Sequence, residues 1–218
     1  MLLFLAIVLV LVLLLLALSI AIEAVNPPRC TAGWALARHL PVDPGEIGLR
    51  FSSWTLDCPD GTALPVWEIP IDADAAGGLT VILLHGWGRS RIESLGRIRP
   101  FLALPPGTVQ RILLYDLRGH GDAEGSRSRL GWREEGDLLE LIRRCGARRV
   151  LLGGHSMGGV IAIQAATADD PTAGSIVGVI AWGPYPDIHV PLRNRLALKN
   201  APTRPVTDLA LLLLRIVG

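Results

Sequence analysis

The hydrophobic positions of this chain form one continuous N-terminal run and a series of short runs farther along. Residues 1–22 contain no charged side chain, and nearly all are Leu, Val, Ile or Ala. A helix needs about 20 apolar residues to cross a bilayer. No Lys or Arg precedes the run, as it would in a cleavable signal peptide. Residues 1–23 are therefore expected to form an uncleaved transmembrane anchor. The alternative is removal after a small-residue site near Ala21–Ala24, followed by export.

The basic residues nearest the run are Arg29 and Arg38, and both follow it. The positive-inside rule then predicts a single-pass membrane protein whose remaining chain lies in the cytoplasm. The interval 24–48 is Pro-rich and weakly patterned, which predicts a linker.

The next two runs predict a β-hairpin. Leu49–Asp57 and Ala63–Ile71 favour strands, and Pro59–Gly61 supplies the turn between them. Pro65 and Pro70 cannot donate backbone hydrogen bonds, so the second run is predicted as an edge strand.

Short apolar runs then alternate with segments of helical pattern. The runs are typical of parallel strands buried on both faces: Leu79–Leu84, Arg111–Tyr115, Val150–Leu152 and Ile176–Trp182. The segments between them favour helices: Arg91–Leu104, Trp132–Cys145 and Met157–Ala168. This alternation predicts an α/β fold over residues 49–183, with a mostly parallel sheet flanked by helices.

The composition of the chain argues against several classes of protein. The chain has 218 residues, half of them hydrophobic, which is enough for one domain with a sizeable core. The net charge of +1 predicts no nucleic-acid partner. The cysteines show no metal-ligand spacing, so neither a metal site nor a disulfide framework is expected. A bridge between Cys30 and Cys58 would require an exported domain.

Candidate chemistry begins at the nucleophile turn, Gly154-His155-Ser156-Met157-Gly158, which fits the pattern G-x-S-x-G. The turn follows an apolar strand and precedes a helical segment. Glycines two positions before and after Ser156 leave room for the backbones to pass, and the tight turn pushes the hydroxyl out of the sheet. Ser156 is therefore predicted to be a nucleophile.

Two further loops follow strand ends. In His85-Gly86-Trp87-Gly88, the backbone N–H of Trp87 is expected to form an oxyanion hole with that of Met157, while His85 holds the loop. In Asp116-Leu117-Arg118-Gly119-His120-Gly121, Asp and Arg are expected to tie the loop to its neighbours. A direct catalytic role is not expected for His120 or Asp116.

Together these three motifs resemble the α/β-hydrolase fold superfamily, most of all serine hydrolases of the monoacylglycerol lipase, lysophospholipase-like or esterase type. The resemblance covers residues 49–182. It implies ester or lipid-like acyl substrates, no cofactor, and a cap region that begins in the interval 184–218.

The expected triad is incomplete. A serine nucleophile needs a base and an acid that orients the base, and the resemblance implies the order Ser, Asp or Glu, His. Asp187 is the candidate acid, and His189 is the only histidine after Ser156. His189 is a weak candidate for the base, and His155 is excluded because adjacent side chains on the turn point different ways.

These observations favour a membrane-anchored serine hydrolase that is truncated at its C-terminus, with a complementing chain as partner if the gene is split. The alternative is a catalytically impaired remnant that acts as a membrane-anchored binding domain. A cofactor-free haloperoxidase or thioesterase on the same fold also fits the sequence.

Overall fold

The computed structural model describes residues 1–75, 77–123, 125, 127–198, 200 and 202–217. The chain forms two compact units. The first combines Met1–Asn26 with Tyr185–Gly218, and the second is Pro27–Pro184. Each unit is described by itself.

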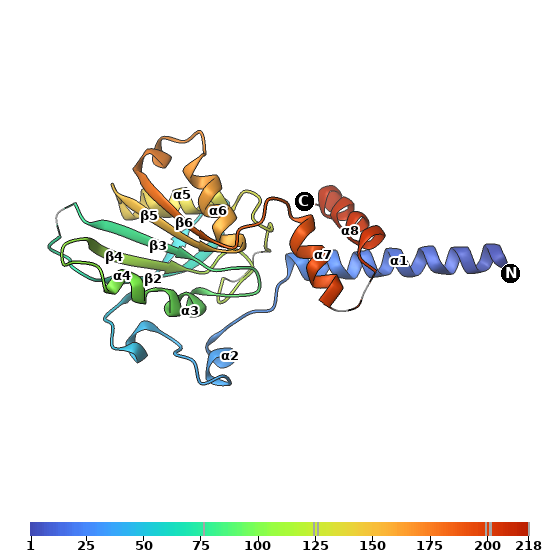
Figure 1. Ribbon diagram of the computed structural model, residues 1–218, viewed down its shortest axis with the longest axis horizontal. Helices are drawn as coiled ribbons and strands as arrows, with labels where there is room; N and C mark the ends of the chain where they lie inside the picture. The colour runs from blue at the N-terminus through green and yellow to red at the C-terminus, as the bar shows by residue number, and fades with distance from the viewer. Residues whose placement is uncertain (76, 124, 126, 199, 201, 218) are drawn as a thin grey trace. The chain divides into compact units, whose positions relative to one another are not determined.

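The second unit is built on a six-stranded sheet with the order β1-β2-β4-β3-β5-β6 (Figure 1). Strands β4, β3, β5 and β6 run parallel, and β1 and β2 continue the sheet antiparallel from β4. The strands are β1 Ser52–Asp57, β2 Ala63–Pro70, β3 Leu79–Leu84, β4 Val109–Tyr115, β5 Val150–His155 and β6 Ile176–Trp182. This mixed sheet confirms the predicted α/β fold class and the hairpin.

The prediction that the second hairpin strand lies at an edge is wrong. β2 lies between β1 and β4, and its two prolines fall at or just beyond the ends of its pairing with β4. Pro65 precedes the first residue paired with β4, and its carbonyl accepts a bond from Asp116 N at 3.1 Å. Pro70 is the last residue of the strand. The edges of the sheet are β1 and β6.

Helices cover both faces of the sheet, with α5 and α6 on one side and α3 and α4 on the other (Figure 1). Their bounds are α3 Arg91–Ser94, η2 Leu95–Arg97, α4 Arg99–Leu102, α5 Glu134–Cys145, α6 Met157–Ala166 and η3 Pro171–Ser175. The single helix predicted over 91–104 is therefore wrong. Pro100 lies in the first turn of α4, where its missing N–H is tolerated, and this favours a new start over a continuous helix.

The interval predicted as a linker carries two short helices, α2 Ala32–Leu36 and η1 Pro44–Ile47. Asp43 caps η1, because its side chain accepts bonds from Gly45 N at 2.7 Å and Glu46 N at 3.2 Å. Ala35 is fully buried in the hydrophobic core beside α3 and α4. This segment thus contributes to the second unit.

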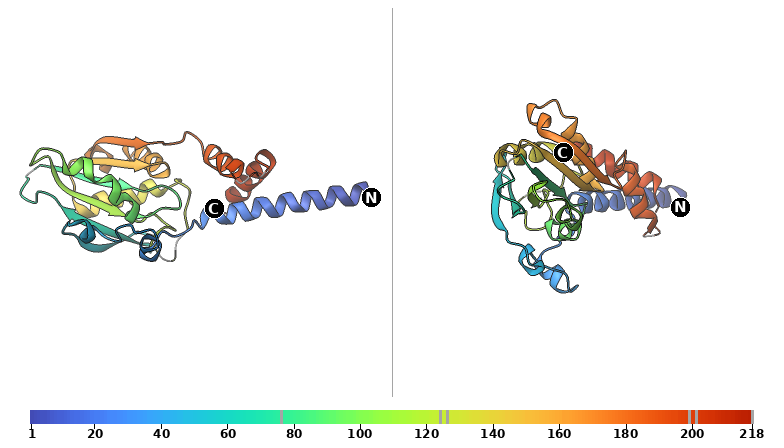
Figure 2. Two further views of the ribbon diagram at one scale, coloured as in Figure 1. Left: turned by 60° about the horizontal axis from the view of Figure 1, so that its bottom comes forward. Right: turned by 60° about the vertical axis from the view of Figure 1, so that its left-hand side comes forward.

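The first unit contains α1 Leu2–Val25, α7 His189–Leu198 and α8 Arg204–Val217. Ala17 and Ala21 of α1 pack in one cluster with Val206 and Ala210 of α8, and both views in Figure 2 show the two helices side by side. Within the described residues, α1 is the one helix long and apolar enough to cross a membrane, with a mean hydropathy of 3.4. Its place near the N-terminus also suits a signal sequence.

Candidate active site

The nucleophile turn joins β5 to α6 through a strained residue. Ser156 has φ 52° and ψ −114°, which is unusual for a residue with a side chain and is typical of functional turns. Its backbone N–H donates to the carbonyl of Trp182, at the end of β6, at 2.8 Å. The turn is therefore held against the neighbouring strand, with Ser156 half-buried.

Two glycines make this turn sterically feasible. A Cβ on Gly154 would lie 2.2 Å from the carbonyl oxygen of Gly158. A Cβ on Gly158 would lie 2.6 Å from the carbonyl oxygens of His85 and Leu84, at the end of β3. No side chain fits at either position, so the first turn of α6 packs backbone to backbone on β5 and β3.

The loop after β3, residues 85–88, reaches the nucleophile turn through another glycine. A Cβ on Gly86 would lie 3.0 Å from His155 Nδ1 and 3.5 Å from Ser156 Cβ. Trp87 follows Gly86, and Met157 is the buried first residue of α6. The structure thus brings this loop to Ser156, and a helix N-terminus there favours negative charge. The roles of Trp87 and Met157 as oxyanion donors stay predictions.

His85 is fully buried and both of its ring nitrogens are bonded. Nδ1 donates to the Gly86 carbonyl at 2.8 Å, and Nε2 accepts from the backbone N–H of Leu117 at 3.0 Å. Burial holds the pKa of His85 well below its usual value, so the ring is neutral. It joins the loop after β3 to the loop after β4.

The loop after β4, residues 116–122, is held by buried charge. Asp116 accepts bonds from the backbone N–H groups of Arg91 at 2.7 Å and Asp122 at 2.9 Å, and it pairs with the Arg91 guanidinium. Burial raises the pKa of Asp116 to about 6, although Arg91 opposes this shift.

Arg118 ties the same loop to two distant elements. Its guanidinium binds Asp137 of α5 through Nε at 2.5 Å and Nη2 at 2.7 Å. Its Nη1 binds Asp60 in the hairpin turn at 2.6 Å. The hydrogen bond from Arg118 holds the pKa of Asp60 well below its usual range. These contacts give Asp116 and Arg118 a structural role in holding the loop after β4.

His120 lies beside His85, with the ring centroids 5.1 Å apart. Its Nδ1 donates to the Arg118 carbonyl at 2.7 Å, and burial lowers its pKa to about 4. Among the described residues, no histidine ring is hydrogen-bonded to the Ser156 hydroxyl.

The candidate acid Asp187 pairs with the histidine that follows it. Asp187 Oδ1 lies 2.5 Å from His189 Nδ1 and 2.8 Å from the His189 backbone nitrogen. These hydrogen bonds hold the pKa of Asp187 below its usual value. Both residues belong to the first unit, whereas Ser156 belongs to the second.

Sequence reasoning missed two groups near these loops. Glu134, at the start of α5, is fully buried, and burial raises its pKa to about 8. Its Oε1 accepts from the backbone N–H of Arg129 at 2.7 Å. Arg29 and Cys30 bond to the loops after β4 and β3. Single polar contacts of this kind leave no periodic signal in a sequence.

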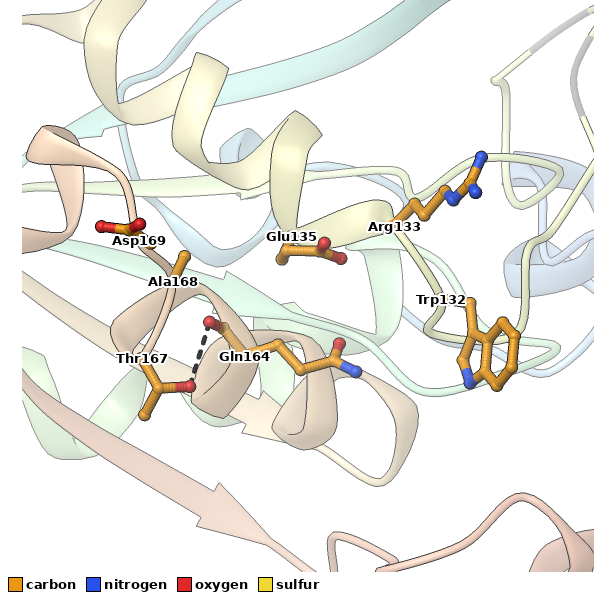
Figure 3. Close-up of a pocket in the computed structure, with 7 residues that line it drawn as sticks. All are labelled: Trp132, Arg133, Glu135, Gln164, Thr167, Ala168 and Asp169. Carbon is orange, nitrogen blue, oxygen red and sulfur yellow. Dashed lines mark hydrogen bonds between the residues drawn. The ribbon is translucent and has the colours of Figure 1, made fainter.

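A pocket of about 470 Å³ lies elsewhere, between the start of α5 and the end of α6 (Figure 3). Its lining residues are Trp132, Arg133, Glu135, Gln164, Thr167, Ala168 and Asp169. Ser156 is not among them, so this pocket is separate from the nucleophile turn. In the described part of the chain, no group of three or more His, Cys, Asp or Glu side chains could hold a metal ion.

Comparison with known proteins supports the fold. A sequence model described as the alpha/beta hydrolase family matches residues 81–216. The curated 30 kDa magnesium-chelatase subunit of Rhodobacter capsulatus is 34% identical over 113 residues, which cover 51% of this chain and 37% of that protein. The chain thus matches well under half of the length of this relative.

Solved structures share the fold. An esterase of Pyrococcus furiosus superposes with a TM-score of 0.64 at 23% identity, covering 85% of this chain and 68% of the esterase. A bacterial membrane phospholipase A superposes with a TM-score of 0.52 at 23% identity. The match covers 69% of this chain and 44% of the phospholipase chain. At these identities the likeness establishes the fold alone.

Proposed function

We propose that this chain, which belongs to the alpha/beta hydrolase family, is a membrane-anchored serine hydrolase that cleaves carboxylic esters with Ser156 as nucleophile. The observation that carries the proposal is the geometry of Ser156. It sits at φ 52° on a turn between strand and helix, with Gly86 of the preceding loop against it. This strand–turn–helix arrangement is the structural context in which a nucleophilic serine acts in acyl transfer, which supports the proposal.

The proposed reaction has two stages. The Ser156 Oγ attacks the ester carbonyl as its proton passes to a general base, and the backbone N–H groups of Trp87 and Met157 stabilise the oxyanion. Collapse of this intermediate breaks the bond to the alkoxide, which takes up the proton from the base and leaves as the alcohol. Water then hydrolyses the acyl-enzyme to the carboxylic acid and restores Ser156. The exposed apolar face of α1 suits a membrane location and lipid-like acyl groups.

Hydrolysis of p-nitrophenyl esters by the full chain in detergent tests the proposal. Wild type is expected to turn over, and Ser156→Ala to lose at least about 10³-fold in kcat. Ser53→Ala, which changes an exposed serine on β1, is the matched control and should keep the wild-type rate. Rates that rise from acetate to decanoate would support lipid-like substrates. Equal turnover by wild type and Ser156→Ala would refute the assignment.

The second candidate is a membrane-anchored binding domain without catalysis. Two observations favour it. No described histidine is bonded to the Ser156 hydroxyl, and the curated relative is named as a chelatase subunit. This candidate predicts a folded protein with no turnover of any ester, and ester hydrolysis that depends on Ser156 would eliminate it.

A further inference from the structure

The segment directly after α1 crosses two loops of the candidate active site. We call this segment, Pro27–Cys30, the strap. The buried thiol of Cys30 donates to the Gly88 carbonyl at 3.1 Å, in the loop after β3. The guanidinium of Arg29 donates through Nη1 to the carbonyl of Gly121 at 3.3 Å, in the loop after β4, and to that of Ala123, just past this loop, at 2.9 Å. One short segment thus bonds to both loops.

Packing reinforces the contact at Gly88. This glycine has φ 69°, a conformation that disfavours other residues, and a Cβ on it would lie 3.4 Å from Pro28 Cγ. Pro27 and Cys30 are themselves buried. The strap therefore rests directly on the backbone that it bonds, and movement of the strap would move Gly88.

In the sequence, Gly88 is only two residues from Gly86, the residue of this loop that lies against Ser156. Trp87 stands between the two glycines. We propose that Arg29 and Cys30 are positioning residues: Cys30 fixes the loop after β3, and Arg29 holds the strap in place through its bonds after β4. Together they place the backbone N–H of Trp87 for oxyanion binding. This proposal rests on the proposed hydrolase function.

Oxyanion stabilisation depends steeply on geometry, because donors must lie about 2.7–3.1 Å from the developing charge. Loss of a whole donor lowers kcat by about 10²–10³-fold, so a displaced donor should have a smaller effect. A thiol–carbonyl bond is weak, and its loss should change stability little. The strap is thus expected to affect catalysis more than folding.

Steady-state kinetics and thermal unfolding of full-chain variants test the proposal. Cys30→Ala and Arg29→Met are expected to lower kcat about tenfold, with KM changed less than about twofold. The melting temperature should fall by only about 2–4 °C. Cys30→Ser and Arg29→Lys retain a donor and should recover most of the rate. Arg38→Met is the matched control, since Arg38 bonds to the Trp34 carbonyl and stacks on the Trp34 ring.

Wild-type kcat in both Cys30→Ala and Arg29→Met would overturn the proposal, as would a rate loss that follows the melting temperature and is not rescued by Cys30→Ser. If wild type shows no turnover, the proposed function fails, and amide hydrogen exchange then tests the strap alone. Arg29→Met should speed exchange in residues 117–123 and Cys30→Ala in residues 86–89. Unchanged exchange in both would refute the strap.

Discussion

The nucleophile turn and the loop after β4 lie at the ends of parallel strands, yet different forces hold them. The turn contains no charged side chain, and contacts between glycine backbones fix it, with Gly154 and Gly158 in places where no Cβ fits. The loop at residues 116–122 is held by ion pairs, in which Arg118 reaches both α5 and the hairpin turn.

Because different forces hold them, the nucleophile turn and the loop after β4 should respond differently to pH and to substitution. Steric contacts between backbones do not titrate, so the turn should tolerate changes of pH but not of shape. Buried charges lose much of their hydration, and their net contribution depends on complete pairing. The charged loop should therefore respond to pH and to loss of a partner. Four predictions test this difference, in order of decreasing effect.

Adding one methyl group to the turn should have the largest effect. Gly154→Ala is expected to lower the free energy of unfolding by about 4 kcal/mol or more, because its Cβ would meet the Gly158 backbone at 2.2 Å. Urea unfolding followed by circular dichroism measures this. Gly136→Ala in α5 is the control, since a Cβ there meets nothing within 4 Å. It should stabilise by about 0.5–1 kcal/mol.

Removing the charge of Arg118, in the loop after β4, should have the second largest effect on stability. Arg118→Met leaves Asp137 buried without its partner, which is expected to lower the free energy of unfolding by about 3 kcal/mol. The same urea experiment at pH 7 measures the change. A loss below about 1 kcal/mol would mean that the pair is not a main support of the loop.

The pH dependence should follow Glu134. Its folded-state pKa of about 8 lies above the ordinary 4.5, so the folded chain keeps a proton that the unfolded chain has lost. The free energy of unfolding should therefore fall as the pH rises toward 8 and then level off. Glu134→Gln should flatten this fall between pH 6.5 and 8.5, as measured by urea midpoints. Glu135→Gln is the control, and a slope unchanged in Glu134→Gln would contradict the assignment.

An exposed ion pair should matter least. Arg143 pairs with Glu140 and Asp170 at the surface, and its side chain is 46% exposed. Arg143→Ala is expected to change the free energy of unfolding by about 0.5 kcal/mol or less, because water screens the charges. If Arg143→Ala lowered the free energy of unfolding as much as Arg118→Met, burial would not explain the difference in stability between the exposed and the buried ion pair.

The sequence was most informative where one physical signal dominates. The mostly apolar runs Leu79–Leu84 and Ile176–Trp182 match β3 and β6 at both ends. The nucleophile turn was recognisable because Gly154 and Gly158 flank Ser156 at a fixed spacing, although Gly158 also packs on the distant Leu84 and His85. Both signals are local, so a single sequence carries them.

Features that depend on distant partners were not predictable. The internal place of β2 is possible because Pro65 precedes its pairing with β4 and Pro70 ends it, and the pattern does not encode where this pairing begins and ends. The strap bonds through Arg29 and Cys30 to residues more than fifty positions away. Burial of Glu134 depends on how α5 packs, and composition gave no sign of it.

Covalent labelling shows directly whether Ser156 is an activated nucleophile. The full chain in detergent is treated with a fluorophosphonate, and the modified peptide is mapped by mass spectrometry. We expect one adduct, on Ser156, that is absent from Ser156→Ala and retained in Ser53→Ala. No adduct on the folded wild-type protein, or an adduct on another residue that persists in Ser156→Ala, would contradict Ser156 as an activated nucleophile.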